Sequence, residues 1–179
     1  MRRQVVFAHG KESGPRGVKI EALAAVARRA GWTTSAPDFS GIDDPQKRVE
    51  LLLVAVKPAK PLVLVGSSMG GYVVTAASRI LRPAALFLLA PAFGMPGYPA
   101  EQTNPEPVTD RCVVIHGWRD QVVKPQQVVS WAESYRAELL LVDDDHPLRA
   151  SLPDVQRRFA QLLEQLAPHS SSALAALLG

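Results

Sequence analysis

Short apolar runs alternate along the chain with stretches in which apolar positions recur every three or four residues. The runs have the length of buried strands, and the stretches have the 3.6-residue period of amphipathic helices. This alternation predicts an α/β fold: a doubly wound, mostly parallel six-stranded sheet with helices on both faces. Strands are expected at Gln4–Ala8, Thr33–Pro37, Leu62–Val65, Ala85–Leu89, Arg111–Ile115 and Glu138–Val142.

Proline and glycine delimit the helices expected between these strands. Proline suits the first turn of a helix, where its missing N–H is not needed, and it stops a helix that precedes it. The segment from Pro91 to Asp110 holds five prolines and is expected to be an extended loop. We expect one α/β domain over residues 1–168, with residues 169–179 as a tail or short helix. Helices are expected at Arg16–Ala30, Pro45–Val56, Met69–Leu81, Pro125–Tyr135 and Pro153–Leu166.

One strand-to-helix junction, Gly66-Ser67-Ser68-Met69-Gly70, has the pattern G-x-S-x-G with Ser68 at its centre. A nucleophile on such a sharp turn needs strained backbone, and side chains two residues away on either side would collide with neighbouring elements. Glycine at both positions removes those side chains. The alternative is a glycine-rich turn that only joins strand to helix, and the apolar strand directly before the motif argues against it.

A serine hydroxyl becomes a good nucleophile only when a base removes its proton and a third group orients that base. Asp120 follows the fifth strand and His146 follows the sixth, so both are expected at the carboxyl edge of the sheet, where α/β proteins bind ligands. His9 and His116 precede glycines at strand ends, and we interpret them as structural. His169 lies in the tail.

Three consecutive aspartates, Asp143 to Asp145, are alternative acids. A side chain next to His146 in sequence cannot easily face Nδ1 of that imidazole, so we interpret these residues as a solvated turn. A metal site built from them is disfavoured because no second cluster of ligands occurs elsewhere in the sequence. We expect no metal and no cofactor.

Five segments carry a resemblance to a known family: VVFAHGKESGP, GSSMGG, LLAPAF, HGWRDQVV and DDDHPL. In content and order they resemble the α/β-hydrolase superfamily, in particular its small serine esterases without a cap domain, over nearly the whole chain. The resemblance implies that Ser68 is the nucleophile, His146 the general base and then acid, and Asp120 the orienting carboxylate. The family's first antiparallel strands have no counterpart here.

The same resemblance implies an oxyanion hole made of backbone N–H groups. Met69, which follows the nucleophile, would supply the first and Lys11 the second, with Glu12 as the alternative to Lys11. Phe93 and Trp118 are expected either to wall the substrate pocket or, with equal weight, to pack in the core.

The predicted activity is the hydrolysis of carboxylic esters or thioesters through an acyl-enzyme. Amide, lactone or C–C bond hydrolysis by the same residues and a non-catalytic binding module on this fold are the alternatives. A nucleotide-binding protein is disfavoured because neither G-x-G-x-x-G nor G-x-x-x-x-G-K-[ST] occurs.

Composition limits the partners and the compartment. The net charge of +3 is mild and the basic residues are scattered, so no nucleic-acid partner is expected. The longest apolar stretch, Ala84 to Phe93, is too short to span a bilayer, and the single cysteine, Cys112, demands no oxidising compartment. We expect a cytoplasmic protein that acts on a small-molecule ester or thioester, with its oligomeric state open.

Overall fold

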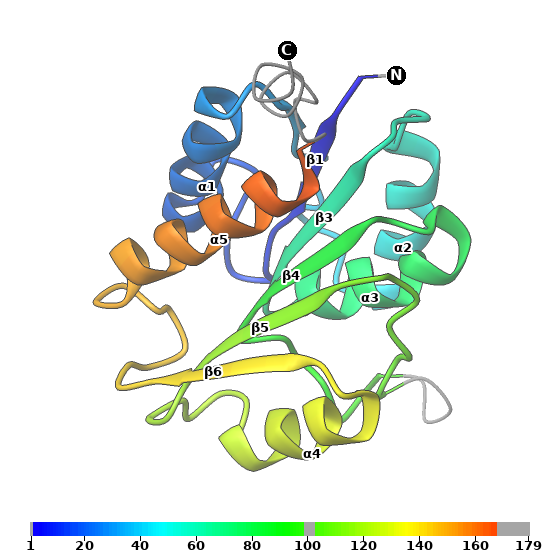
Figure 1. The fold of residues 1–179 in the computed structure, drawn as a ribbon. Helices are drawn as coiled ribbons and strands as arrows, with labels where there is room; N and C mark the ends of the chain where they lie inside the picture. Colours follow the sequence, from blue (N-terminus) through cyan, green and yellow to red (C-terminus); the bar gives the residue numbers. More distant parts are fainter. Residues whose placement is uncertain (1, 99–102, 168–179) are drawn as a thin grey trace.

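Six parallel strands form the centre of the computed structural model, which describes residues 2–98 and 103–167 (Figure 1). Neighbouring strands all run parallel, in the order β2-β1-β3-β4-β5-β6. The α/β class and the six-stranded sheet predicted from the sequence are confirmed. The strands are β1 (Gln4–Ala8), β2 (Thr33–Ser35), β3 (Leu62–Ser67), β4 (Ala85–Leu89), β5 (Cys112–Gly117) and β6 (Glu138–Val142).

Helices cover both faces of this sheet (Figure 1). On one face α1 packs against α5, and on the other α2 packs against α3, with α4 beside β5 and β6. No helix among the described residues has the length and apolar character needed to cross a membrane. The helices are α1 (Val18–Arg29), α2 (Pro45–Ala55), α3 (Met69–Leu81), α4 (Pro125–Tyr135) and α5 (Leu152–Leu166).

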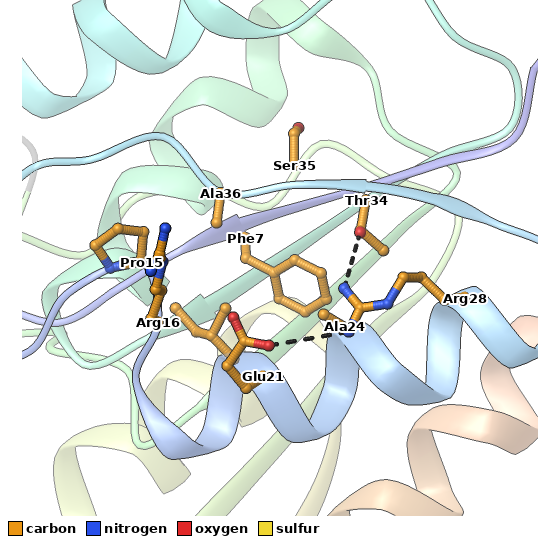
Figure 2. Close-up of a pocket in the computed structure, with 10 residues that line it drawn as sticks. Phe7, Pro15, Arg16, Glu21, Ala24, Arg28, Thr34, Ser35 and Ala36 are labelled. Atoms are coloured by element: carbon orange, nitrogen blue, oxygen red, sulfur yellow. Dashed lines mark hydrogen bonds and ion pairs between the residues drawn. The ribbon is translucent and has the colours of Figure 1, made fainter.

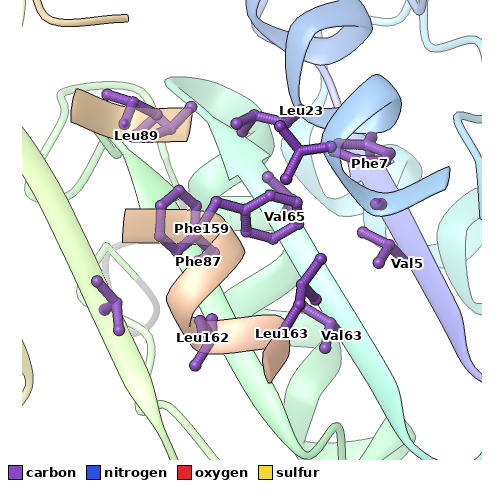
Figure 3. Packing of buried hydrophobic residues seen from close by; sticks show 14 of the residues in the cluster. Val5, Phe7, Leu23, Val63, Val65, Phe87, Leu89, Phe159, Leu162 and Leu163 are labelled. Atoms are coloured by element: carbon purple, nitrogen blue, oxygen red, sulfur yellow. The ribbon is translucent and has the colours of Figure 1, made fainter. Parts of the chain in front are cut away.

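Two hydrophobic cores form because strand side chains alternate between the faces of the sheet. Val65 belongs to the core beneath α1 and α5, whereas its neighbour Leu64 belongs to the core beneath α2 and α3. Figure 3 shows the first core, in which Phe159 of α5 reaches down to the strands. Its ring centroid lies 4.9 Å from that of Phe87 and 6.4 Å from that of Phe7.

Several strand and helix ends differ by one or two residues from the sequence-based expectations; α1, for example, begins at Val18 rather than Arg16, and α5 at Leu152 rather than Pro153. β2 stops at Ser35 rather than Pro37, since its pairing with β1 ends there. β3 continues to Ser67, which still pairs with Leu89 of β4, and β5 continues to Gly117, which pairs with Val142 of β6. Partner strands therefore set these boundaries, and a single apolar run does not reveal its partners. The predicted tail, residues 169–179, lies outside the described residues.

The carboxyl ends of all six strands lie along one edge of the sheet, since the strands are parallel. β3 lies between β1 and β4, so the loop after β1 runs beside the β3–α3 junction. The proline-rich segment after β4 is irregular where the structure describes it, as predicted. Trp131 of α4 donates from its indole nitrogen to the carbonyl of Pro105, at 3.0 Å, and so ties this segment to α4.

Candidate active site

The junction between β3 and α3 holds strained backbone. Ser68 has φ 54° and ψ −121°, a positive φ that residues other than glycine rarely adopt. A Cβ atom on Gly66 would lie 2.6 Å from the Cα of Gly71, and one on Gly70 would overlap the carbonyl of Ala8. Both motif glycines therefore stand where another backbone segment leaves no room for a side chain. The turn lifts Ser68 out of the sheet edge and leaves its side chain partly exposed.

Three side chains from separate loops meet beside this junction. Nε2 of His146 lies 3.0 Å from Oγ of Ser68, and Nδ1 lies 2.7 Å from Oδ2 of Asp120. Both distances are those of hydrogen bonds. An ionised Asp120 accepts only, so Nδ1 carries the proton and Nε2 has a free lone pair toward the serine hydroxyl. The structure thus brings together the serine, imidazole and carboxylate that the sequence analysis selected.

Asp120 is held by more than the imidazole. Its Oδ1 accepts from the backbone N–H groups of Val122 and Val123 at 2.8 and 2.9 Å, and its side chain is fully buried. Burial alone would raise the pKa of Asp120, but the hydrogen bonds from His146 and from these two amides outweigh it and hold the pKa below its usual value. Asp120 is therefore a fixed anion at neutral pH.

The other two described histidines are buried and hydrogen-bonded. Nε2 of His116 donates to the carbonyl of Val123 at 3.0 Å and lies 3.4 Å from Oδ2 of Asp120. Burial lowers the pKa of His116, which keeps this ring neutral, and its Nδ1 has no partner among the described residues. His9 is 0% exposed and belongs to the loop after β1. His169 lies outside the described residues.

The three consecutive aspartates behave differently from one another, which corrects the prediction of a uniformly solvated turn. Asp143 is exposed and pairs with Arg119, whereas Asp144 is only 4% exposed. Asp144 accepts from the backbone N–H groups of Asp145 and Ser151, each at 2.8 Å, and thereby shapes the loop that carries His146. No group of three or more potential metal ligands converges within residues 2–98 and 103–167.

The two residues expected to supply an oxyanion hole, Met69 and Lys11, belong to the two segments that adjoin Ser68. Met69 is the first residue of α3, where helical N–H groups have no partner within the helix. Gly10, which precedes Lys11, lies against the serine, because a Cβ atom on Gly10 would be 3.3 Å from Cβ of Ser68. Among the backbone hydrogen bonds of the described residues outside regular elements, none is donated by Met69 or by Lys11.

The two aromatic residues proposed for the substrate pocket have contrasting surroundings. Phe93 is 0% exposed and stacks on Trp131, with ring centroids 4.2 Å apart. These contacts are those of a core residue. Trp118 follows β5 and is 54% exposed, so its indole is open to a ligand at the strand edge.

Two cavities lie away from Ser68. The one in Figure 2, of about 330 Å³, lies between α1 and the strands β1 and β2, with Phe7 in its floor. Its Arg28 already contacts Glu21 at 3.9 Å and Thr34 at 3.5 Å. The second, of about 500 Å³, is lined by α4 and by residues of the segment after β4. Neither lining includes a residue of the serine site.

Sequence reasoning missed a lysine near the site. Lys19, in the first turn of α1, is half-buried. Burial lowers the pKa of Lys19 to about 8, although the carboxylates of Asp120, Asp144 and Asp145 oppose this shift. No sequence signal marked it, because its neighbours in space follow β5 and β6, far along the chain.

Comparisons with known proteins agree with this architecture. A family model described as Uncharacterised protein family (UPF0227) matches residues 4–106. An alpha/beta-superfamily protein from Xanthomonas campestris pv. campestris is 36% identical, with a TM-score of 0.80, and the match covers 92% of this chain and all of that one. A search of curated proteins finds no match.

More distant solved structures share the fold. Est1E from Butyrivibrio proteoclasticus is 16% identical, with a TM-score of 0.75, over 92% of this chain and 88% of that one. XC6422 from Xanthomonas campestris, titled an a/b serine hydrolase without lid, is 22% identical, with a TM-score of 0.69, over 95% and 85%. On the family match and the 36% identical relative, this chain belongs to the UPF0227 family and to the alpha/beta hydrolase superfamily.

Proposed function

We propose that this protein is a serine hydrolase that cleaves carboxylic esters or thioesters through an acyl-enzyme. The observation that carries the proposal is the continuous series of hydrogen bonds from Asp120 through His146 to Ser68, at 2.7 and 3.0 Å. Such a series activates a hydroxyl that is otherwise a poor nucleophile. The esterases and serine hydrolases among the structural neighbours support the same reaction class.

Acylation begins when Ser68 Oγ attacks the substrate carbonyl and Nε2 of His146 takes the hydroxyl proton. The imidazolium that forms lies 2.7 Å from the Asp120 carboxylate, which stabilises its charge and holds its orientation. His146 then gives this proton to the departing alcohol or thiol. Ser68 is left as an acyl ester.

Deacylation repeats these roles with water. Nε2 of His146 removes a proton from the attacking water, and the second tetrahedral intermediate collapses to the free acid and the Ser68 hydroxyl. In both steps the negative charge develops on the former carbonyl oxygen. The N–H groups of Met69 and Lys11 would stabilise it, and removal of one such donor typically costs about 10²- to 10³-fold in kcat.

The substrate is proposed to be small or otherwise accessible. The described part of the segment after β4 is irregular, and Trp118 stands exposed at the strand edge. Est1E, which shares the fold, has been solved with ferulic acid, a small carboxylic acid, bound. We expect short acyl chains to be preferred on model esters, and activity rising steeply with chain length would contradict an open site.

Two alternatives use the same fold. Amide, lactone or C–C bond hydrolysis would need the same three side chains, and only a substrate panel separates these activities. A non-catalytic binding module would not need an imidazole bonded both to a hydroxyl and to a buried carboxylate, so this geometry argues against it.

Kinetics on short p-nitrophenyl esters and thioesters test the proposal. Ser68→Ala and His146→Ala should each lower kcat at least about 10³-fold, and the double variant should be no worse than either single one, since the residues act as a unit. Ser67→Ala is the matched control and should retain activity. Hydrolysis that persists in Ser68→Ala would refute the proposal.

A further inference from the structure

Arg48 of α2 is a buried cation that the reaction scheme above leaves unused. It is 1% exposed, and its guanidinium carbon lies 5.6 Å from the centroid of the Phe39 ring. None of the ion pairs found among residues 2–98 and 103–167 includes Arg48. Buried arginines are usually paired with a carboxylate. The groups that accept hydrogen bonds from Arg48 in place of a carboxylate are therefore informative.

Backbone carbonyls take the place of that carboxylate. Nη1 of Arg48 donates to the carbonyls of His9 at 3.1 Å and Gly10 at 3.3 Å, and Nε donates to the carbonyl of Ile42 at 2.6 Å. Two of these three acceptors belong to the loop after β1, which runs beside Ser68. Arg48 therefore ties α2 to the loop from which the second oxyanion donor is proposed to come.

The Gly10 carbonyl has a second donor. Nε2 of His9 accepts from the backbone N–H of Phe39 at 2.9 Å, so the proton of this imidazole is on Nδ1. That nitrogen donates to the Gly10 carbonyl at 2.8 Å. Donors from His9 and Arg48 thus fix the direction of one carbonyl, and with it the whole peptide plane between Gly10 and Lys11.

In a trans peptide the N–H points opposite to the C=O. Because the Gly10 carbonyl points at Arg48 and His9, the Lys11 N–H points to the other side, and Gly10 itself lies against Ser68. We propose that Arg48, together with His9, is a positioning residue that aims the Lys11 N–H at the oxyanion formed on Ser68. This inference rests on the proposed function and deepens it.

The charge on Arg48 adds to the geometry. A cationic donor on a carbonyl draws electron density from the peptide group, which makes the N–H of the same peptide a stronger donor. A neutral donor would orient the plane with less polarisation. Arg48→Lys, which keeps the charge but not the planar fork that reaches Ile42 and Gly10 together, should therefore fall between wild type and Arg48→Met.

Steady-state hydrolysis of p-nitrophenyl acetate gives the first readout. Arg48→Met should lower kcat about 10- to 100-fold, less than complete loss of one oxyanion donor, with KM within about twofold of wild type, because the donor acts on the transition state. Arg79→Met, an exposed arginine of α3 that pairs with Glu106 at 3.2 Å, is the matched control and should match wild type. A folded Arg48→Met with wild-type kcat would overturn the inference.

A double-mutant cycle separates positioning from a merely structural tie. Lys11→Pro deletes the backbone N–H, and Lys11→Ala, which keeps it, is the reference for the loss of the side chain. If Arg48 acts through that N–H, Arg48→Met should cost little further activity in the Lys11→Pro background. Losses that multiply in the double variant would overturn the proposal.

The failure modes remain distinguishable. If hydrolysis does not depend on Ser68, the proposed function is wrong. If hydrolysis depends on Ser68 but Arg48→Met has wild-type kcat, only this inference is wrong. If circular dichroism shows that Arg48→Met is unfolded, Arg48→Lys replaces it in the double-mutant cycle with Lys11→Pro. The Lys11 side chain is exposed, and the backbone hydrogen bonds of the described loops include none donated by its N–H, so we expect Lys11→Pro to fold. A kcat for Lys11→Pro equal to that of Lys11→Ala would by itself overturn the inference.

Discussion

Replacing Asp120 by asparagine tests the role of the His146 tautomer, because it changes which ring nitrogen carries the proton and leaves the shape of the site unchanged. In the structure Oδ1 of Asp120 accepts from the N–H groups of Val122 and Val123, while Oδ2 accepts from Nδ1 of His146. The asparagine oxygen must keep accepting from the Val122 and Val123 N–H groups, because the reverse orientation would place its NH₂ group against these two donors. Its NH₂ group therefore faces His146, 2.7 Å away in the present geometry, and only a lone pair on Nδ1 can meet it.

The consequence for activity follows from that change. With Nδ1 as acceptor, the imidazole proton moves to Nε2 and faces Ser68, so the base is lost while the site keeps its shape. We expect kcat to fall about 10³- to 10⁴-fold, which corresponds to roughly 4 to 5.5 kcal/mol of transition-state stabilisation. The KM should change little, because no residue proposed to contact the substrate is altered.

The assay is steady-state hydrolysis of p-nitrophenyl acetate, with thermal unfolding of the same samples to show that the fold persists. Asp143→Asn is the matched control: this aspartate is exposed, pairs with Arg119 and precedes the same histidine, and its variant should retain wild-type kcat. An Asp120→Asn variant that keeps more than a tenth of wild-type kcat would refute the reasoning, and so would an equal loss in Asp143→Asn.

Three further predictions concern the scaffold. Gly70→Ala should abolish activity or soluble expression, because its Cβ would overlap the carbonyl of Ala8, and normal kinetics would contradict the close packing of the elbow. Phe159→Ala should lower the free energy of unfolding by about 3 to 5 kcal/mol in urea titrations, and a loss below 1 kcal/mol would show that the core repacks. Burial alone would raise the pKa of Asp144, but hydrogen bonds from the Ser151 and Asp145 amides outweigh it and hold the pKa below its usual value. The ionised carboxylate therefore stabilises the fold fully above its unfolded pKa of about 4, and this contribution is lost as pH falls through the lower folded pKa. The stability gap between wild type and Asp144→Asn should accordingly narrow from pH 5 to pH 2, and a gap independent of pH would exclude this linkage.

Much of the fold was predictable because local signals coincide with its boundaries. Prolines at the starts of α2 and α4 marked those helices correctly, since proline at the first position needs no N–H partner. The order β2-β1-β3-β4-β5-β6 could not be derived from the runs themselves, because an apolar run does not state which strands flank it. The ends of β2, β3 and β5 were wrong by one or two residues for the same reason.

The site divides along similar lines. Ser68, Asp120 and His146 could be selected because each lies within four residues of the carboxyl end of a strand, and parallel strands place such residues on one edge. Arg48 could not, since in the pattern of α2 it reads as one more polar position, and only carbonyls some forty residues earlier explain its burial. Asp144 was predicted to be solvated because its burial depends on a hydrogen bond from the backbone N–H of Ser151, seven residues later, and the sequence does not show that the loop brings the two together.

Trapping the acyl-enzyme tests the central claim most directly. The protein is mixed with p-nitrophenyl acetate, quenched in acid within the first turnover and digested, and the peptides are analysed by mass spectrometry. The account predicts an acetyl group on Ser68 that is absent from Ser68→Ala. Acetylation confined to another residue, or release of p-nitrophenol that continues at the wild-type rate in Ser68→Ala, would contradict it.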